Sequence, residues 1–223
     1  EGCAMNRLLF EKRGDAVYLS HLDLMRVFQR AFKRAGILIW HSQGFSPRAY
    51  VSIALPLPVG MESRCEILDF EIEDGSVELS GLPARLNAVL PAGIRVLEAY
   101  ESARKIKELT RLRAEVTLEY DSGVPKDAQK ALAAFFARES IVITKHSKKG
   151  DKELDIKPLI FALSIAAVSE NELRLACILS AQNPGLNPQL LAAAIETHLP
   201  DYKPDFARAG RMEALDEQEN PFR

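Results

Sequence analysis

The sequence predicts an α+β protein with antiparallel sheets, and three observations lead to this fold class. Short segments with alternating apolar residues, typical of half-buried strands, are interspersed with segments whose apolar residues repeat at three and four, typical of helices. The order strand, helix, two strands, helix, strand can be followed in the first half, and a similar order recurs in the second. The 223 residues suffice for two small domains. We therefore expect two tandem ferredoxin-like modules, each a split β-α-β unit.

The predicted boundaries divide the chain into three parts. The first module is expected at 5–103 and the second at 111–200. Residues 201–223 are polar and show no periodicity, so they are expected to form a loosely docked C-terminal tail. No repeat is visible residue by residue between the two modules, so their similarity is one of architecture alone.

The first module contains the clearest helix of the sequence. Ser20 is a good N-cap, Asp23 stands at the third helical position, and Gly36 supplies a C-terminal stop, which together predict a helix at 21–35. The other elements predicted here are strands at 7–13, 37–41, 50–55, 65–73 and 93–100 and a helix at 79–90. Acidic residues alternate with apolar ones at 65–73, so that strand is expected to be half exposed.

The second module shows the same two kinds of pattern. Strands are predicted at 112–120, 141–146 and 172–181, and one or two more at 154–169. Helices are predicted at 125–138, which is rich in alanine, and at 187–198.

Composition excludes several classes of protein. With 47% hydrophobic and 27% charged residues, the chain has an ordinary globular profile. The longest apolar run, 158–168, is too short to span a membrane, and the N-terminus lacks the layout of a secretory signal. Cys65 and Cys177 lie far apart without CxxC spacing, so neither a zinc site nor a disulfide framework is indicated. A cytoplasmic location is the expectation.

The net charge of −2 conceals an asymmetry. Between Arg7 and Gly60 there are eight basic and three acidic residues, whereas between Met61 and Glu101 there are three basic and nine acidic residues. An anionic ligand is therefore compatible with the near-neutral chain, provided that its site is local.

A basic stripe on the predicted 21–35 helix is the first candidate site. Arg26, Arg30 and Lys33 recur at i, i+4 and i+7 and so share one face, with Arg34 beside them. Such a stripe is ordinarily a solvated helix face. Because no acidic residue is interleaved with these four cations, binding of phosphates is the preferred interpretation, and pairing with the acidic 65–73 strand is the alternative.

The loop after this helix is the second candidate. Gly44 and Pro47 shape its backbone, while Phe45, Arg48 and Tyr50 offer two stacking rings and a planar cation, the groups that bind single-stranded bases and phosphates. The alternative is that the two aromatic rings close the core under the helix.

Evidence for catalysis is weaker. His21 stands two residues before Asp23 at the helix start and is a minor candidate for a general base, although a polar residue of the first helical turn is the simpler interpretation. The sequence contains no nucleotide-binding glycine loop, catalytic triad or metal-ligand cluster, so no cofactor and no metal are expected.

At these residues the chain resembles the radical-SAM-linked proteins of bacteria, domains of uncharacterised function found alone or C-terminal to cobalamin-binding radical SAM proteins. The similar segments are 10–14, 20–36 (SHLDLMRVFQRAFKRAG), 43–47 (QGFSP), 54–60 (ALPLPVG) with 62–63, and 86–94. The usual family loop reads Gly-Phe-Asn-Pro-His-Pro, whereas Arg48 stands here in place of the histidine. This replacement weakens acid–base or metal chemistry and retains anion binding. The chain also lacks the CxxxCxxC cysteines of a radical SAM core, so the resemblance implies the linked domain and not the radical enzyme.

The preferred functional hypothesis is a non-catalytic module that binds RNA, or another nucleic acid, and presents it to a separate enzyme, such as a radical SAM enzyme. Its expected binding residues are Arg26, Arg30, Lys33, Arg34, Phe45, Arg48 and Tyr50. One alternative is a protein-interaction subunit that docks a radical SAM partner or a second copy of the chain. Another is a metal-independent RNA-processing enzyme that uses His21.

Overall fold

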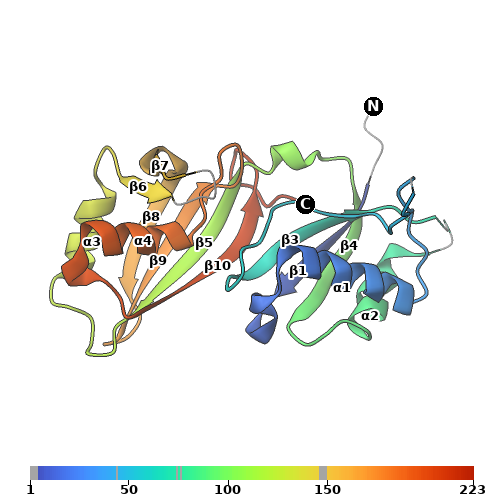
Figure 1. Cartoon of the computed structure of the whole chain (residues 1–223), viewed down its shortest axis with the longest axis horizontal. Coiled ribbons are helices and arrows are strands. Elements are labelled where there is room, and N and C mark those ends of the chain that lie inside the picture. The colour runs from blue at the N-terminus through green and yellow to red at the C-terminus, as the bar shows by residue number, and fades with distance from the viewer. Residues whose placement is uncertain (1–4, 44, 74, 76, 146–149) are drawn as a thin grey trace. The chain divides into compact units, whose positions relative to one another are not determined.

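The computed structural model describes residues 5–43, 45–73, 75, 77–145 and 150–223. It confirms a mixed α and β protein with antiparallel sheets. The described residues form four α-helices and ten strands (Figure 1). They divide into two compact units. Unit 1 comprises residues 5–108 together with Pro221–Arg223, and unit 2 comprises Leu109–Asn220. Each unit is described separately below.

Unit 1 places two helices against an antiparallel sheet. Its elements are β1 (Met5–Lys12), α1 (His21–Arg34), β2 (Val51–Ile53), β3 (Glu62–Phe70), α2 (Leu82–Asn87) and β4 (Ile94–Ser102). The strand order is β4-β1-β3-β2, and every neighbouring pair is antiparallel. The apolar residues of β1, β3 and α1 meet in one buried cluster, which fixes α1 against the sheet.

Helix α1 begins and ends where its sequence indicates. Ser20 is the N-cap, and its hydroxyl accepts a hydrogen bond from the Asp23 backbone N–H at 3.2 Å. Gly36, with φ of +66°, follows the last turn and supplies the left-handed conformation that reverses the chain. Phe28 and Phe32 are fully buried; Phe28 packs edge-on against Phe10 at 4.6 Å between ring centroids.

Two strand predictions in unit 1 are corrected. Residues 37–41 form no strand but two isolated bridges, Ile39 with Ile72 and His41 with Ala49, because the segment turns from one partner to the other after two residues. Strand β3 is buried along most of its length and not half exposed. Its Asp69 is buried because its carboxylate receives the guanidinium of Arg7, with Nε and Oδ1 2.6 Å apart.

The last three residues also belong to unit 1. Phe222 is fully buried, and its ring centroid lies 5.3 Å from the guanidinium carbon of Arg7 and 4.6 Å from that of Arg104. The end of the chain is therefore docked by cation–π contacts.

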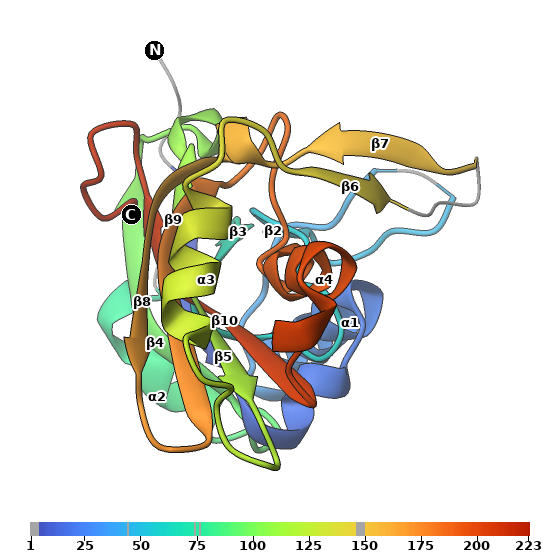
Figure 2. The ribbon, with the colours of Figure 1, turned by 90° about the vertical axis from the view of Figure 1, so that its left-hand side faces the viewer.

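Unit 2 repeats the element order with an inserted hairpin. Its elements are β5 (Arg111–Glu119), α3 (Ala128–Phe136), β6 (Val142–Lys145), β7 (Lys152–Asp155), β8 (Ile160–Ala167), β9 (Glu172–Ser180), α4 (Gln189–His198) and β10 (Phe206–Leu215). The main sheet has the order β10-β5-β9-β8, and β6 and β7 form a separate two-stranded sheet. Figure 2 shows α3 and α4 on one face of the main sheet.

The prediction of a loose tail at 201–223 is wrong. Phe206–Leu215 form β10, which pairs with β5 over its whole length. The strand escapes detection because alanine, glycine and charged residues occupy most of its positions, so its alternation is weak. Arg208 on β10 forms ion pairs with Glu119 on β5 and Glu172 on β9, two strands of the same sheet.

No helix in the described part of the chain is long and apolar enough to cross a membrane.

Candidate anion-binding pocket

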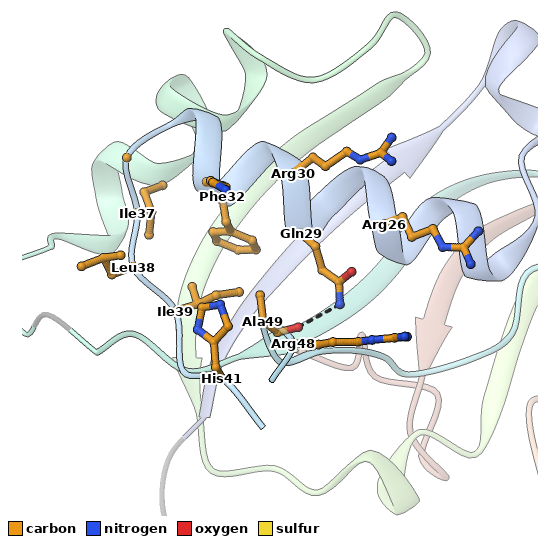
Figure 3. Close-up of a pocket in the computed structure, with 12 residues that line it drawn as sticks. Arg26, Gln29, Arg30, Phe32, Ile37, Leu38, Ile39, His41, Arg48 and Ala49 are labelled. Carbon is orange, nitrogen blue, oxygen red and sulfur yellow. Dashed lines mark hydrogen bonds between the residues drawn. The ribbon is translucent and has the colours of Figure 1, made fainter. Parts of the chain in front are cut away.

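A pocket of about 620 Å³ lies in unit 1 between α1 and the segment that follows it. Its cationic side chains are Arg26, Arg30, Lys33 and Arg48. Its apolar side chains are Phe32, Ile37, Leu38, Ile39 and Ala49. Gln29, Gly36 and His41 complete the lining, which contains no acidic residue. The pocket therefore joins an apolar wall to a positively charged rim (Figure 3).

The geometry of α1 decides which cations reach the pocket. Successive helical residues are rotated by about 100°, so Arg26, Arg30 and Lys33 stay within roughly 60° of one another. Arg34 lies about 140° around the helix from Gln29, by the same rotation, and does not line the pocket. Three of the four stripe cations thus line one pocket, and Arg34 is exposed to solvent outside it.

The opposite wall is formed by the chain after the Gly36 turn. The Ile37 N–H donates to the Phe32 carbonyl at 3.0 Å, which folds the 37–41 arm back beside α1. The Trp40 N–H donates to the Glu71 carbonyl at 2.8 Å, so the arm is also tied to the segment after β3. The Gly36 turn therefore fixes where Leu38 and Ile39 line the pocket.

Gln29 joins the helix to the loop. Its Nε2 donates to the Ala49 carbonyl at 2.9 Å, the bond drawn in Figure 3. The backbone of Arg48, the neighbour of Ala49, is fixed by two hydrogen bonds to Ser42. Its N–H donates to Ser42 Oγ at 3.2 Å, and its carbonyl accepts from the Ser42 N–H at 2.9 Å. The guanidinium of Arg48 is thus presented from an anchored backbone while its side chain stays exposed.

The cations of the pocket differ in their partners. Arg26 Nη1 lies 3.2 Å from Asp23 Oδ1, and hydrogen bonds from Ser20 and then Arg26 lower the pKa of Asp23 below its ordinary 3.8. Arg30, Lys33 and Arg48 make no ion pair with any residue that the structure describes. Among the described residues no ion pair joins the stripe to β3, which was the alternative, and Asp69 of that strand is paired with Arg7. The rim therefore carries uncompensated positive charge.

The loop aromatics lie outside the pocket. Phe45 is fully exposed, which excludes the alternative that it closes the core. Tyr50 is 37% exposed and packs edge-on against Trp40 at 5.8 Å between ring centroids. Gly44 lies outside the described residues. Only Arg48 of the predicted loop set lines the pocket.

His21 is the first residue of α1 and does not line the pocket. Its Nδ1 is buried without a hydrogen-bond partner in the described structure, and no hydrogen bond joins it to Ser42 or Tyr50. No group of three or more potential metal ligands is present among the described residues. Among the described residues, the geometry therefore brings His21 to neither the pocket nor the two side chains considered with it in the sequence.

The sequence reasoning did not assign the remaining lining residues to this site, among them Gln29, Leu38 and His41, and it did not foresee the support that Arg85 gives to α1. Gln29 has the spacing of the stripe, three residues after Arg26, so helical periodicity could have included it. His41 and Leu38 line the pocket only because the chain reverses at Gly36. Arg85 Nη2 on α2 donates to the Ala35 carbonyl at 2.8 Å and so stabilises the C-terminal end of α1, a contact across 50 residues.

Comparisons with known proteins give the fold and a family. The structure described as a Cbf5-Nop10-Gar1 complex aligns with a TM-score of 0.54 at 8% identity, covering 95% of this chain and 50% of that chain. The chain thus spans about half the length of that neighbour, and the likeness concerns the fold alone. A structure described as an unknown protein from Galdieria sulphuraria aligns with a TM-score of 0.26 at 9% identity, covering 95% of this chain and 99% of that one. No curated protein matches the sequence.

The family comparison covers most of the chain. Residues 6–188, which include all of the pocket, match the profile described as "uncharacterized protein conserved in bacteria" (DUF2344). The chain belongs to this family of bacterial proteins of unknown function.

Proposed function

We propose that this protein is an RNA-binding accessory module, without catalytic activity of its own, that presents RNA to a separate enzyme. The observation that carries the proposal is the rim of the unit 1 pocket, where Arg30, Lys33 and Arg48 have no ion pair with described residues and no acid lines the site. Uncompensated arginine and lysine side chains around a concavity are the pattern that binds phosphates.

The pocket favours RNA over an acidic protein surface as the ligand. A protein that docks through carboxylates would be matched by exposed cations alone, whereas here the cations surround an apolar wall that includes Leu38 and Ile39. Phosphates alternating with flat apolar bases present both kinds of group along one strand. Phe45, fully exposed on the adjoining loop, offers a further stacking surface of the same kind.

The scaffold and the sequence resemblance support this proposal to a smaller extent. The strand orders β4-β1-β3-β2 and β10-β5-β9-β8 support the proposal that each unit is a ferredoxin-like module. Split β-α-β modules are a common scaffold for RNA binding, which is an analogy of fold only. The resemblance of 20–36 and 43–47 to radical-SAM-linked proteins suggests a radical SAM enzyme as the partner that receives the RNA.

Charge reversal at the rim tests the proposal. Combining Arg30→Glu with Arg48→Glu should weaken binding of a mixed-sequence single-stranded RNA about tenfold or more at low salt, because two phosphate contacts become repulsive. The matched control combines Lys126→Glu with Lys130→Glu, which changes the net charge equally at exposed positions of unit 2 that do not line the pocket. This control should change affinity by no more than about twofold, since exposed charges that do not contact the ligand are screened.

Two results would overturn the proposal. The first is a purified protein that retains no RNA at low salt; the second is a control variant that loses as much affinity as the rim variant. Co-purification with a radical SAM enzyme that survives nuclease treatment and the rim substitutions would instead identify a protein-docking subunit.

A further inference from the structure

We infer that the unit 1 pocket receives one unpaired nucleotide, with its base against the apolar wall and its phosphate on the cationic rim. The inference rests on the proposed RNA binding and deepens it, because it names the part of an RNA strand that the site recognises. A base held inside a duplex could not enter the pocket, so the recognised RNA must be single-stranded or must expose an unpaired base there.

The size of the pocket requires more than a phosphate. Its volume of about 620 Å³ falls within the roughly 300–1,000 Å³ of small-molecule sites, far above what a phosphate group alone occupies. The apolar part of the lining consists of Phe32, Ile37, Leu38, Ile39 and Ala49. Phe32, Ile37 and Ile39 are buried and form the floor of the wall, whereas Leu38 is 63% exposed at its edge. A flat, largely apolar group is the complementary occupant.

The rim supplies the counter-charge at the edges of that wall. Figure 3 shows Arg26 extending from α1 and Arg48 extending from the loop, on two sides of the space that the Gln29–Ala49 hydrogen bond spans, with Arg30 at the edge of α1 farther from the loop. A phosphate next to the bound base is therefore within the field of cations from two separate elements. Guanidinium groups suit this role because their planar donors match pairs of phosphate oxygens.

His41 adds a second feature expected of a base-binding site. Its imidazole ring lines the pocket from the arm opposite α1 and points toward the helix (Figure 3). Flat rings of this kind stack on unpaired bases in single-strand RNA recognition. An acyl chain with an anionic head would also meet the apolar wall, but it would draw no stacking from His41.

Three probes separate the parts of this ligand: AMP, adenosine and inorganic phosphate. Their binding to the intact chain can be followed by the fluorescence of Trp40, the only tryptophan, which lies in the 37–41 arm between two pocket-lining residues. AMP should bind about tenfold or more tightly than adenosine or phosphate, since only AMP occupies both the wall and the rim. Calorimetric titration provides an independent measurement.

Two variants assign the halves of the ligand to the two surfaces. Leu38→Glu places a carboxylate on the apolar wall and should weaken both AMP and adenosine, AMP by about tenfold or more. Its matched control is Leu22→Glu, which is equally 63% exposed in unit 1 but lies outside the pocket and should leave both affinities within about twofold. Arg48→Gln, at an exposed loop position, should weaken AMP while leaving adenosine unchanged.

The outcomes distinguish this inference from the proposed function. One outcome is that RNA binding depends on salt, Arg30 and Arg48, while AMP binds no better than phosphate and duplex RNA binds as well as single-stranded RNA. In that case the nucleotide pocket is refuted and RNA binding stands. If AMP behaves as expected and no RNA is retained, the RNA proposal is refuted and the pocket is a mononucleotide site. Equal losses in Leu38→Glu and Leu22→Glu would also refute the assignment of the wall.

Discussion

The two units of this chain follow similar element orders, yet their cationic side chains have different neighbours. In unit 2 four cations around the main sheet and α4 lie beside glutamates: Arg111 with Glu219, Arg174 with Glu115, Lys203 with Glu196, and Arg208 with Glu119 and Glu172. In unit 1, Arg30, Lys33 and Arg48 surround a pocket and no described acid pairs with them. The difference shows that the number of cations on a surface says little about anion binding until their partners are known.

The cavities of the two units differ in the same way. The cavity between α3 and β8 in unit 2 measures about 350 Å³ and contains a single cation, Lys157. That amine donates to the Phe136 carbonyl at 2.6 Å, so one of its donors serves the end of α3. The shared architecture therefore does not by itself gather several cations around a cavity, as the unit 1 pocket does.

The largest expected effect contrasts a buried ion pair of unit 1 with an exposed one of unit 2. Asp69→Asn leaves the guanidinium of Arg7, 1% exposed, without a counter-charge and should lower the free energy of unfolding by about 3–5 kcal/mol. Glu119→Gln, beside the 61% exposed Arg208, should lower it by less than about 1 kcal/mol. Urea unfolding followed by Trp40 fluorescence for unit 1 and by circular dichroism for the whole chain measures both. Equal losses would contradict the contrast.

The next effect concerns salt. If three or four phosphates contact the unit 1 rim, the logarithm of the RNA affinity should fall with the logarithm of the salt concentration with a slope of about −2 to −3. Affinity should then drop roughly 20- to 50-fold between about 50 mM and about 200 mM salt. In the Arg30→Glu and Arg48→Glu double variant the slope should be shallower by about 1 to 2. A slope near zero in the unmodified protein would show that its cations are not the binding groups.

The smallest effect is a difference in alkaline stability. Burial raises the pKa of Tyr100 in unit 1 to about 12, and in unit 2 it raises those of Tyr120 and Cys177 to about 12. Between the ordinary pKa values of 9.0 to 10.0 and about 12, the unfolded chain loses protons that the folded chain retains. Stability should therefore fall as the pH rises through this window, and more in unit 2, which has two such groups.

Hydrogen exchange followed by mass spectrometry at pH values below and above 9 would measure this loss for each unit separately, after correction for the intrinsic rate. A greater loss in unit 1 would contradict the expectation. Tyr120→Phe removes one ionisable hydroxyl and should reduce the difference, although it also removes the hydrogen bond from that hydroxyl to the Tyr202 carbonyl at 3.0 Å.

The sequence predicted a helix or strand well where the periodicity of its apolar residues is bounded by residues that favour a turn or a cap. The N-cap Ser20 and the stop at Gly36 place α1 almost to the residue, since both effects act within one helical turn. Strand β10 was missed because its alternation is weak and its stability comes from pairing with β5, whose residues stand 87 to 104 positions earlier. Burial of β3 was missed for a similar reason, because Asp69 is neutralised by Arg7 from another strand.

The sequence by itself determined that α1 carries a basic face and that an aromatic, arginine-bearing loop follows it, because helical periodicity and turn chemistry are local properties. Only the tertiary structure decided which of these groups share a site. The reversal at Gly36 and the Gln29–Ala49 hydrogen bond bring Arg48 to Arg26, Arg30 and Lys33, and they leave Arg34, Phe45 and Tyr50 outside. Such convergence depends on contacts between distant residues, and so does the lack of an ion pair between Arg30, Lys33 or Arg48 and any described acid.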